Sequence, residues 1–221
     1  ETKPDYCKKE HVDMMLSYGI TRIEIGVQSL QERVYKIVNR GHNYNDVTES
    51  FQISKDAGYK IVAHMMPGLP TMTPEGDIAD FKKLFSDPQL RPDMLKIYPS
   101  LVIENTPLYE KYKQGKYTPY SDEDMIKVLT EAKREVPKWV RIMRIQREIS
   151  PKEIIAGPKS GNLRQIVHQN LAKLGLSCKC IRCREAGLTN KTDGGDVKLT
   201  RINYDSSGGK EVFLSYEDKN E

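Results

Sequence analysis

Two segments of the chain are predicted to be strands that end in loops rich in glycine, proline and polar residues. In residues 22–29 (RIEIGVQS), isoleucine and valine alternate with arginine, glutamate and glycine, which predicts a strand with one apolar and one polar face. Residues 60–70 (KIVAHMMPGLP) form the second segment. In a protein built from βα-repeats, helices cover the apolar face, and polar side chains at the carboxyl ends of the strands build the site. The two segments therefore predict an α/β enzyme of the barrel type.

Helical patterns alternate with these strands. Further strands are predicted at 94–98 and 139–146, and helices near 8–18, 30–38, 45–57, 74–85 and 122–136. Strands separated by helices predict βαβ units and a parallel sheet. Four strands are too few for a complete eight-stranded barrel, so residues 1–150 are interpreted as a partial (βα) barrel.

The remaining residues divide into a linker and a hairpin. Residues 151–190 combine basic residues, an amphipathic helix near 163–174 and a cysteine cluster. In residues 191–221, two strand-like segments flank the sequence SSGG at 206–209, which predicts a β-hairpin. We expect this hairpin to start a second α/β domain. Both ends of the chain look interrupted, so we expect an internal piece of a larger protein.

Composition and charge limit the class of protein. A hydrophobic content of 38% and a charged content of 30% fit a folded globular chain. No apolar run approaches the roughly 20 residues of a membrane span, and no signal peptide is present, so we expect a cytoplasmic protein without membrane contact. The net charge is +4, but residues 131–185 hold thirteen Lys and Arg residues against five acids. This basic block suggests nucleic acid as a partner, and a solvated charged face is the alternative.

Three cysteines, Cys178, Cys180 and Cys183, lie within six residues. This spacing lets one metal ion take several thiolates, and zinc is the first expectation. Three cysteines leave one ligand open, for which Cys7 and His168 are both candidates. Reduced thiols without metal are the main alternative, and an iron–sulfur cluster is a weaker one.

Glu24 is predicted to lie on the inner face of its strand. A carboxylate in such a place needs a partner, because an unpaired buried charge is costly. That partner is either Arg22 or another basic residue, or a cationic or hydroxylated ligand.

Polar residues at neighbouring strand ends form a candidate pocket. His64 precedes the sequence MMPGLP, and Gly68 between two prolines would let the backbone approach a flat ligand such as adenine. Residues 28–29 and 40–42 are expected at the same edge of the sheet. His64 could equally be a hydrogen-bonded core residue.

Several long motifs resemble one known family. They are residues 1–7 (ETKPDYC), 22–29 (RIEIGVQS), 39–42 (NRGH), 62–70 (VAHMMPGLP), 96–99 (KIYP), 144–147 (RIQR), 161–164 (GNLR), the cysteine cluster with residues 184–185, and 211–218 (EVFLSYED). Together they resemble the catalytic subunit family of Elongator, which combines radical S-adenosylmethionine (SAM) and acetyltransferase chemistry in tRNA wobble-uridine modification.

The resemblance implies a fold and a set of cofactors. It implies a partial radical SAM barrel with SAM beside a [4Fe–4S] cluster, a zinc-bearing linker, and then the start of a GNAT-like acetyltransferase domain. Acetyl-CoA would supply the group placed on C5 of uridine 34, and Elongator-type subunits would be partners. By matched motif, the residues lining the SAM pocket would be Glu24, Gln28, His64, Pro67 and Gly68, with Lys96 and Tyr98 near its mouth. The family's cluster-binding cysteines precede this region and its acetyl-CoA loop follows residue 221, so this segment alone is expected to be inactive.

The basic block would hold tRNA while one base enters the barrel. The residues expected to contact RNA are Arg141, Arg147, Lys152, Lys159, Arg164, Arg182 and Arg184. Two other functions stay open: a radical SAM enzyme acting on a porphyrin-type small molecule, and a zinc-stabilised RNA-binding scaffold without catalysis.

Overall fold

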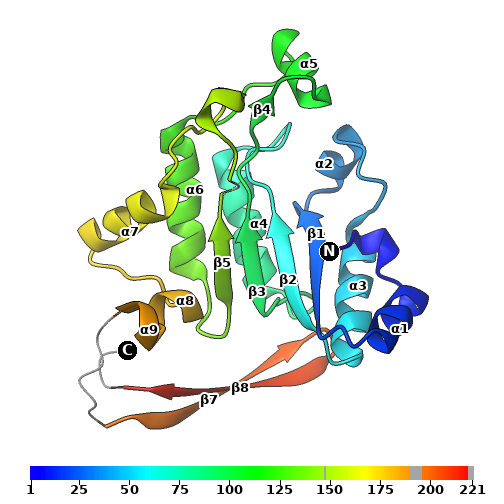
Figure 1. The fold of residues 1–221 in the computed structure, drawn as a ribbon, viewed down its shortest axis with the longest axis vertical. Helices are drawn as coiled ribbons and strands as arrows, with labels where there is room; N and C mark the ends of the chain where they lie inside the picture. Colours follow the sequence, from blue (N-terminus) through cyan, green and yellow to red (C-terminus); the bar gives the residue numbers. More distant parts are fainter. Residues whose placement is uncertain (147, 190–195, 219–221) are drawn as a thin grey trace.

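The computed structural model describes residues 1–146, 148–189 and 196–218 (Figure 1). Its centre is a four-stranded sheet with the strands β1 (Arg22–Gln28), β2 (Lys60–Met65), β3 (Met94–Ile97) and β5 (Arg141–Ile145) in that order. All neighbouring strands are parallel. The four strands occupy the predicted segments, so the prediction of a parallel α/β sheet is confirmed.

The predicted helices are present, and three of them begin at a residue whose side chain caps the first turn. They are α1 (Lys9–Ser17), α2 (Glu32–Ile37), α3 (Tyr44–Asp56), α4 (Pro74–Ser86) and α6 (Asp122–Glu135). The side chains of Asn43, Thr73 and Ser121 accept hydrogen bonds from backbone amides in the first turns of α3, α4 and α6. Among the described residues, no helix is long and apolar enough to cross a membrane.

Helices cover one face of the sheet and leave the other open (Figure 1). On β1, Ile23, Ile25 and Val27 are buried in the main core. The helices contribute large apolar side chains to the same core, including Phe51 of α3 and Phe81 of α4. Because successive side chains of a strand point to opposite faces, Glu24 lies on the open face. This alternation is what the sequence predicted.

The connection between β3 and α6 has structure that the sequence did not reveal. It contains β4 (Val102–Ile103) and α5 (Pro107–Lys113), and β4 pairs antiparallel with β6 (Ile154–Ala156), which follows a short 3-10 helix, η2 (Pro151–Glu153). These strands are two and three residues long, too short to show a period.

The segment after residue 150 packs on the barrel. Helix α7 (Leu163–Lys173) buries Leu163, Val167 and Leu171 in the same core as the sheet. Two short helices follow, α8 (Ile181–Arg184) and α9 (Ala186–Thr189), and the amide of Ile181 donates to the carbonyl of Val140 at 3.0 Å. The cysteine cluster is thereby held beside the start of β5.

Strands β7 (Lys198–Ser206) and β8 (Gly209–Glu217) form the predicted hairpin. Ser207 and Gly208 at its turn both have positive φ, as a two-residue hairpin turn requires. The hairpin lies across the amino-terminal ends of the parallel strands (Figure 1). The amide of Ser207 donates to the carbonyl of Pro88 at 2.6 Å, and Tyr204 stacks on Trp139 with ring centroids 4.1 Å apart. The hairpin is thus anchored to the barrel, and its assignment to an acetyltransferase domain stays a prediction.

Candidate functional site at the carboxyl ends of the strands

Three strands contribute to one polar cluster on the open face of the sheet. Nε2 of His64 on β2 lies 2.8 Å from Oε2 of Glu24 on β1. The ammonium group of Lys96 on β3 donates a hydrogen bond to the same oxygen. The partners that Glu24 was predicted to need are therefore His64 and Lys96. The sequence had singled out all three residues.

The charges in this cluster are unequally distributed. Burial alone would raise the pKa of Glu24, but the hydrogen bonds from Lys96 and His64 outweigh it and lower that pKa. Burial lowers the pKa of His64, although Glu24 and Glu1 oppose this shift. Glu24 is thereby favoured in its ionised form, whereas burial disfavours the charged form of His64.

Tyr98 and Glu1 extend the cluster. The ring of Tyr98, just after β3, meets the His64 ring edge-on at 5.4 Å. Oε1 of Glu1 lies 3.3 Å from Nδ1 of His64. The resemblance predicted Tyr98 near the mouth of the pocket, and it lies at the carboxyl end of the strands beside His64.

A cleft of about 430 Å³ opens beside this cluster. It is lined by Glu1, Thr2, Lys3, Tyr6, Gly26, Gln28, Arg40 and Met66. The first residues of the chain form one wall, because the amide of Thr2 donates to the carbonyl of Glu24 and the amide of Gly26 donates to the carbonyl of Thr2. Gln28 was predicted to lie here.

Gly26 and Arg40 shape this cleft. A Cβ atom on Gly26 would come within 2.9 Å of both the Arg40 guanidinium and the Gln28 side-chain amide. Nη2 of Arg40 donates to the carbonyl of Gly26 at 3.0 Å. Oε1 of Gln28 and Nε of Arg40 are buried and have no hydrogen-bond partner among the described residues. Such buried polar atoms fit a polar ligand in the cleft.

Pro67 and Gly68 are buried and are not among the residues that line the cleft. Gly68 has a φ of 84°, and its amide donates to Oδ2 of Asp77 at 2.8 Å. The Tyr120 hydroxyl donates to the same oxygen at 2.7 Å, and the Tyr117 hydroxyl donates to the carbonyl of Gly68 at 2.7 Å. The turn after β2 is thus held in place on both sides.

Asp80, one helical turn after Asp77 on α4, holds the loop after β1 in a similar way. Its carboxylate accepts hydrogen bonds from the Ser29 hydroxyl and the Leu30 amide, both at 2.8 Å. The sequence analysis missed both aspartates. Acidic residues near the start of a helix usually face solvent, and only their spacing of three on the apolar side of α4 could have indicated burial.

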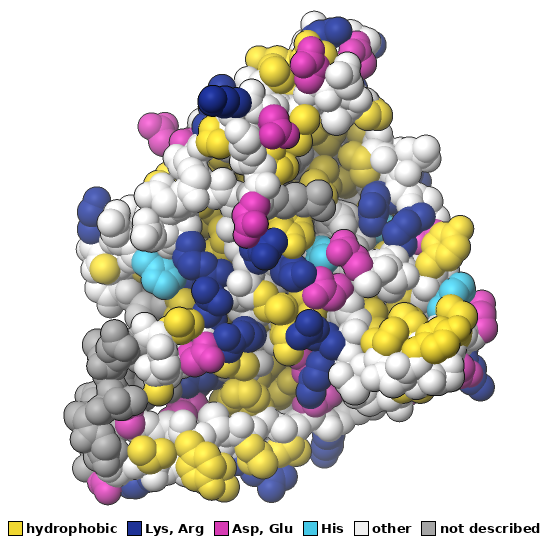
Figure 2. All heavy atoms as spheres, in the orientation of Figure 1, with side chains coloured by type: hydrophobic (Ala, Val, Ile, Leu, Met, Phe, Trp, Pro, Cys, Tyr) yellow, Lys and Arg dark blue, Asp and Glu magenta, His cyan; other side chains and the backbone are white. Residues whose placement is uncertain are grey.

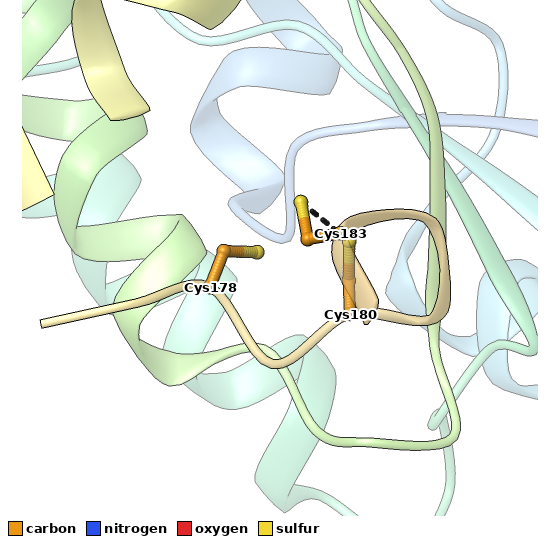
Figure 3. A group of neighbouring side chains, drawn as sticks. All are labelled: Cys178, Cys180 and Cys183. Carbon is orange, nitrogen blue, oxygen red and sulfur yellow. Dashed lines mark hydrogen bonds between the residues drawn. The ribbon is translucent and has the colours of Figure 1, made fainter. Parts of the chain in front are cut away.

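The three predicted metal ligands lie together. The sulfur atoms of Cys178, Cys180 and Cys183 all lie within 4.8 Å of one another (Figure 3). Hydrogen bonds among the thiols raise the pKa of Cys178 and lower that of Cys180. This proximity fits one thiophilic metal ion shared by the three sulfurs.

His168 is the candidate fourth ligand that lies beside this cluster. Its Nε2 atom is 3.5 Å from Sγ of Cys183. Burial lowers the pKa of His168 to about 4, with Lys133 and Arg164 adding to the shift, so the imidazole is neutral as a ligand must be. Cys7 instead packs in the main core, where its sulfur lies 3.4 Å from the Ser54 hydroxyl. Of the two candidates, the structure favours His168.

The residues predicted to contact RNA have different surroundings. Lys152 and Lys159 are exposed, and Arg182 is half-buried. Arg141 forms an ion pair with Glu185 at 2.7 Å, and the half-buried Arg164 donates to the carbonyl of Ile142. Arg147 lies outside the described residues.

Arg184 differs from the other basic residues because protein groups surround it. Nη1 lies 3.0 Å from the Glu217 carboxylate, Nη2 donates to the carbonyl of Lys138, and Nε donates to that of Lys179. Its side chain is only 12% exposed. The structure gives Arg184 a role in joining α8 to the hairpin.

The open face of the sheet carries cations that the sequence analysis did not group together. Figure 2 shows Lys and Arg side chains gathered across the middle of this face. By the register of the strands, which shifts between Leu95 and Lys96, this cationic face comprises Arg22, Lys60, Lys96, Arg141 and Arg144. Carboxylates pair with Lys60, Lys96, Arg141 and Arg144. These residues come from four strands that are far apart in the sequence, and the parallel register brings the strands side by side.

Comparisons with known proteins agree with this fold. Residues 1–84 match the Radical SAM superfamily and residues 92–173 match the Radical_SAM C-terminal domain. These matches and the parallel sheet define a protein of the radical SAM class.

The chain belongs, within that class, to the family of tRNA uridine(34) acetyltransferases and Elongator complex protein 3. It is 46% identical to the tRNA uridine(34) acetyltransferase of Methanocaldococcus infernus over 99% of this chain and 42% of the relative. It is 48% identical to Elongator complex protein 3 of Saccharomyces cerevisiae, over 99% of this chain and 40% of the relative. The structure of M. infernus Elp3 with an N-terminal deletion superposes with a TM-score of 0.95 at 46% identity, covering 99% of this chain and 53% of that one. The chain thus spans about two fifths of the length of these curated relatives.

Proposed function

We propose that this chain is the core of a radical SAM enzyme that modifies C5 of the wobble uridine of tRNA. One observation carries the proposal. One edge of the parallel sheet, at the carboxyl ends of its strands, carries both a polar cluster and a cleft. The cluster consists of Glu24, His64 and Lys96, and the cleft is lined by residues that include Gln28 and Arg40. Ligands bind at this edge in open α/β folds.

The cleft suits the charged and hydroxylated parts of SAM. The unpartnered Nε of Arg40 could donate to the ligand's carboxylate, and Oε1 of Gln28 could accept from its ammonium or ribose hydroxyls. Glu24 would bring a negative charge toward a cationic ligand, held in place by Lys96 and His64. When SAM is bound beside a reduced [4Fe–4S] cluster, it supplies an adenosyl radical. The residues of this chain would bind and orient it.

The cationic face would bind the polynucleotide. A wobble base must leave its stack to reach the cleft, at a cost of a few kcal/mol, and phosphate contacts position the strand while it does so. The relatives' name, tRNA uridine(34) acetyltransferase, supports uridine 34 as the acceptor and an acetyl group as the group transferred. Acetyl-CoA as the donor is part of this proposal and is implied by the family resemblance. Assembly with Elongator-type subunits is part of the same proposal and is supported by the name of the eukaryotic relatives.

We further propose a structural zinc ion at Cys178, Cys180 and Cys183, with His168 as the fourth ligand. The donor set of three sulfurs and one neutral imidazole nitrogen is typical of structural zinc. The ion would fix α8, and Arg184 at its end, against β5 and the hairpin. Its role would be to stabilise this region of the fold.

The proposal is tested with the full-length protein, prepared anaerobically with its iron–sulfur cluster. Arg40→Met and Glu24→Gln should each weaken SAM binding by about tenfold, because each removes a charged group from the site. Arg33→Met, on the exposed side of α2, is the matched control and should bind like the wild type. Mass spectrometry of tRNA nucleosides would follow modification of uridine 34 in the same variants.

Other outcomes would point to the alternatives. Binding of tRNA by a wild-type protein that does not bind SAM would support the RNA-binding scaffold. Binding of SAM without affinity for tRNA would support an enzyme acting on a small molecule.

A further inference from the structure

Lys133 is a fully buried lysine next to the cysteine cluster. It lies on α6, has no exposed surface, and is among the largest fully buried side chains of the described chain. Lysine is almost never fully buried unless it is paired. Within the described ranges, no carboxylate oxygen lies within 4.0 Å of its Nζ atom. The partner that the structure does show is Sγ of Cys183, at 3.4 Å.

A neutral thiol is a poor partner for a buried ammonium group. A thiol carries no charge to offset the cost of removing an ammonium group from water, whereas a thiolate does. The thiolate state is the one in which cysteine binds a metal ion. The position of Lys133 is therefore explained when the cluster is metal-bound.

We propose that Lys133 is the charge-compensating residue of the metal site, donating a hydrogen bond to the Cys183 thiolate and balancing the net charge of the bound site. The inference rests on the zinc site proposed above. A divalent ion with three thiolates and one neutral ligand has a net charge of −1, which one ammonium group cancels. Four thiolates would leave a charge of −2. The ammonium group of Lys133 thus matches a site whose fourth ligand is neutral, such as His168, whose Nε2 atom lies 3.5 Å from Sγ of Cys183.

Arg164 is the other cation that faces the cysteines, but its position differs. It lies in the first turn of α7, is partly exposed, and donates to the carbonyl of Ile142 at 3.2 Å. Its Nη2 atom is thus satisfied by this carbonyl, whereas its Nη1 atom is buried without a hydrogen-bond partner among the described residues, so Arg164 adds a second positive charge near the cysteines. Lys133 differs because it is fully buried and the contact that the structure shows for its Nζ atom is the Cys183 sulfur itself.

The experiment measures zinc affinity in the full-length protein by competition with a chromophoric chelator. Lys133→Met, which keeps the length of the side chain and removes its charge, should weaken zinc binding by about tenfold or more, the usual effect of losing a partner of a metal ligand. Lys133→Arg should restore part of the affinity. Lys127→Met is the matched control, because Lys127 lies on the same helix, is exposed and pairs with Glu75. This control should bind zinc like the wild type.

Thermal unfolding with and without zinc separates this role from simple packing. If Lys133 balances the negative charge of the metal-bound site, adding zinc should raise the melting temperature less in Lys133→Met than in the wild type. A purely structural role would lower the melting temperature equally with and without zinc, and this result would overturn the inference. An unchanged zinc affinity in Lys133→Met would also overturn it.

Cobalt substitution of the wild-type protein gives a test that needs no variant. The intensity of thiolate-to-cobalt charge-transfer bands reports how many thiolates bind the ion. We expect three thiolates, with a nitrogen atom as the fourth ligand. Four thiolates would contradict the inference even if no Lys133 variant folds. A wild-type protein that binds no stoichiometric zinc would instead refute the metal site itself, so the two failures are distinguishable.

Discussion

His64 and Glu24 lie 40 positions apart in the sequence, yet the imidazole Nε2 atom is 2.8 Å from the carboxylate of Glu24. Two adjacent parallel strands, β1 and β2, bring them together on the face that the helices leave open. Because Lys96 from the third strand donates to the same oxygen, one carboxylate connects three strands at the edge where the cleft opens. The ionic state of Glu24 therefore affects both the fold and the site.

Replacing Glu24 by glutamine should lower the free energy of unfolding at pH 7 by about 1–3 kcal/mol, since it removes a charged acceptor shared by two donors. The pKa of Glu24 is lowered in the folded protein. The stabilisation by ionised Glu24 is thus fully present above the pKa that this carboxyl has in the unfolded chain. It is lost as the pH falls through the lower pKa that the carboxyl has in the folded protein. Chemical denaturation of wild type and variant should converge as the solution is acidified below that range. If the free energies of unfolding of wild type and variant still differ by the same amount at acid pH, the charge of Glu24 does not contribute to stability.

Asp77 should produce the opposite dependence on pH. Burial raises the pKa of Asp77 to about 7, although hydrogen bonds from Tyr120 and Gly68 oppose the shift. Between about pH 4 and pH 7 the folded protein holds a proton that the unfolded chain has released, so stability falls as pH rises. Asp77→Asn should remove this pH dependence, which we expect to change the free energy of unfolding by about 4 kcal/mol over the window. The exposed substitution Asp13→Asn is the control and should keep the wild-type slope.

Cys180→Ser should release the metal ion and lower the thermal stability of the linker region. A structural metal ion contributes folding free energy, and Cys180 is fully buried at the centre of the cluster. Elemental analysis together with thermal unfolding measures both effects, and a chelator added to the wild type should reproduce them. Cys7→Ser is the control: it alters a buried core residue and should retain the full complement of metal. Equal metal content in wild type and Cys180→Ser would rule out the zinc site.

Arg144 and Arg184 should respond differently to substitution, although both belong to the basic block. Arg144, at the carboxyl end of β5, is exposed on the cationic face. Its replacement by alanine should weaken tRNA binding and reduce the slope of log affinity against log salt by about 0.7–0.9, the value for one lost phosphate contact. Arg184→Met should instead lower stability, because it breaks the contacts with Glu217 and Lys138, and should leave the slope unchanged. A reduced slope in Arg184→Met would restore the sequence-based prediction for this residue.

The sequence predicted those parts of the fold that have a clear period. The alternation in β1 predicted both the buried face and the open face carrying Glu24, and the turn sequence at 206–209 predicted the hairpin. Short elements such as β4 and β6 carry no period and were not predicted.

The sequence could not show which side chains at the site pair with partners that are distant in the chain. Arg184 looked like a phosphate ligand because its partner, Glu217, lies 33 positions further along the chain. Asp77 and Asp80 were not singled out from the sequence, because the backbone amides that they bind belong to loops that follow strands β1 and β2. The choice of His168 over Cys7 likewise required the folded positions of α7 and α8.

An anaerobic crystal structure of the full-length protein with SAM tests the proposed site most directly. We predict that SAM occupies the cleft beside Gly26, with polar atoms on Oε1 of Gln28 and Nε of Arg40, next to the cluster of Glu24, His64 and Lys96. A bound SAM that touches neither Gln28 nor Arg40 and lies away from this cluster would contradict it.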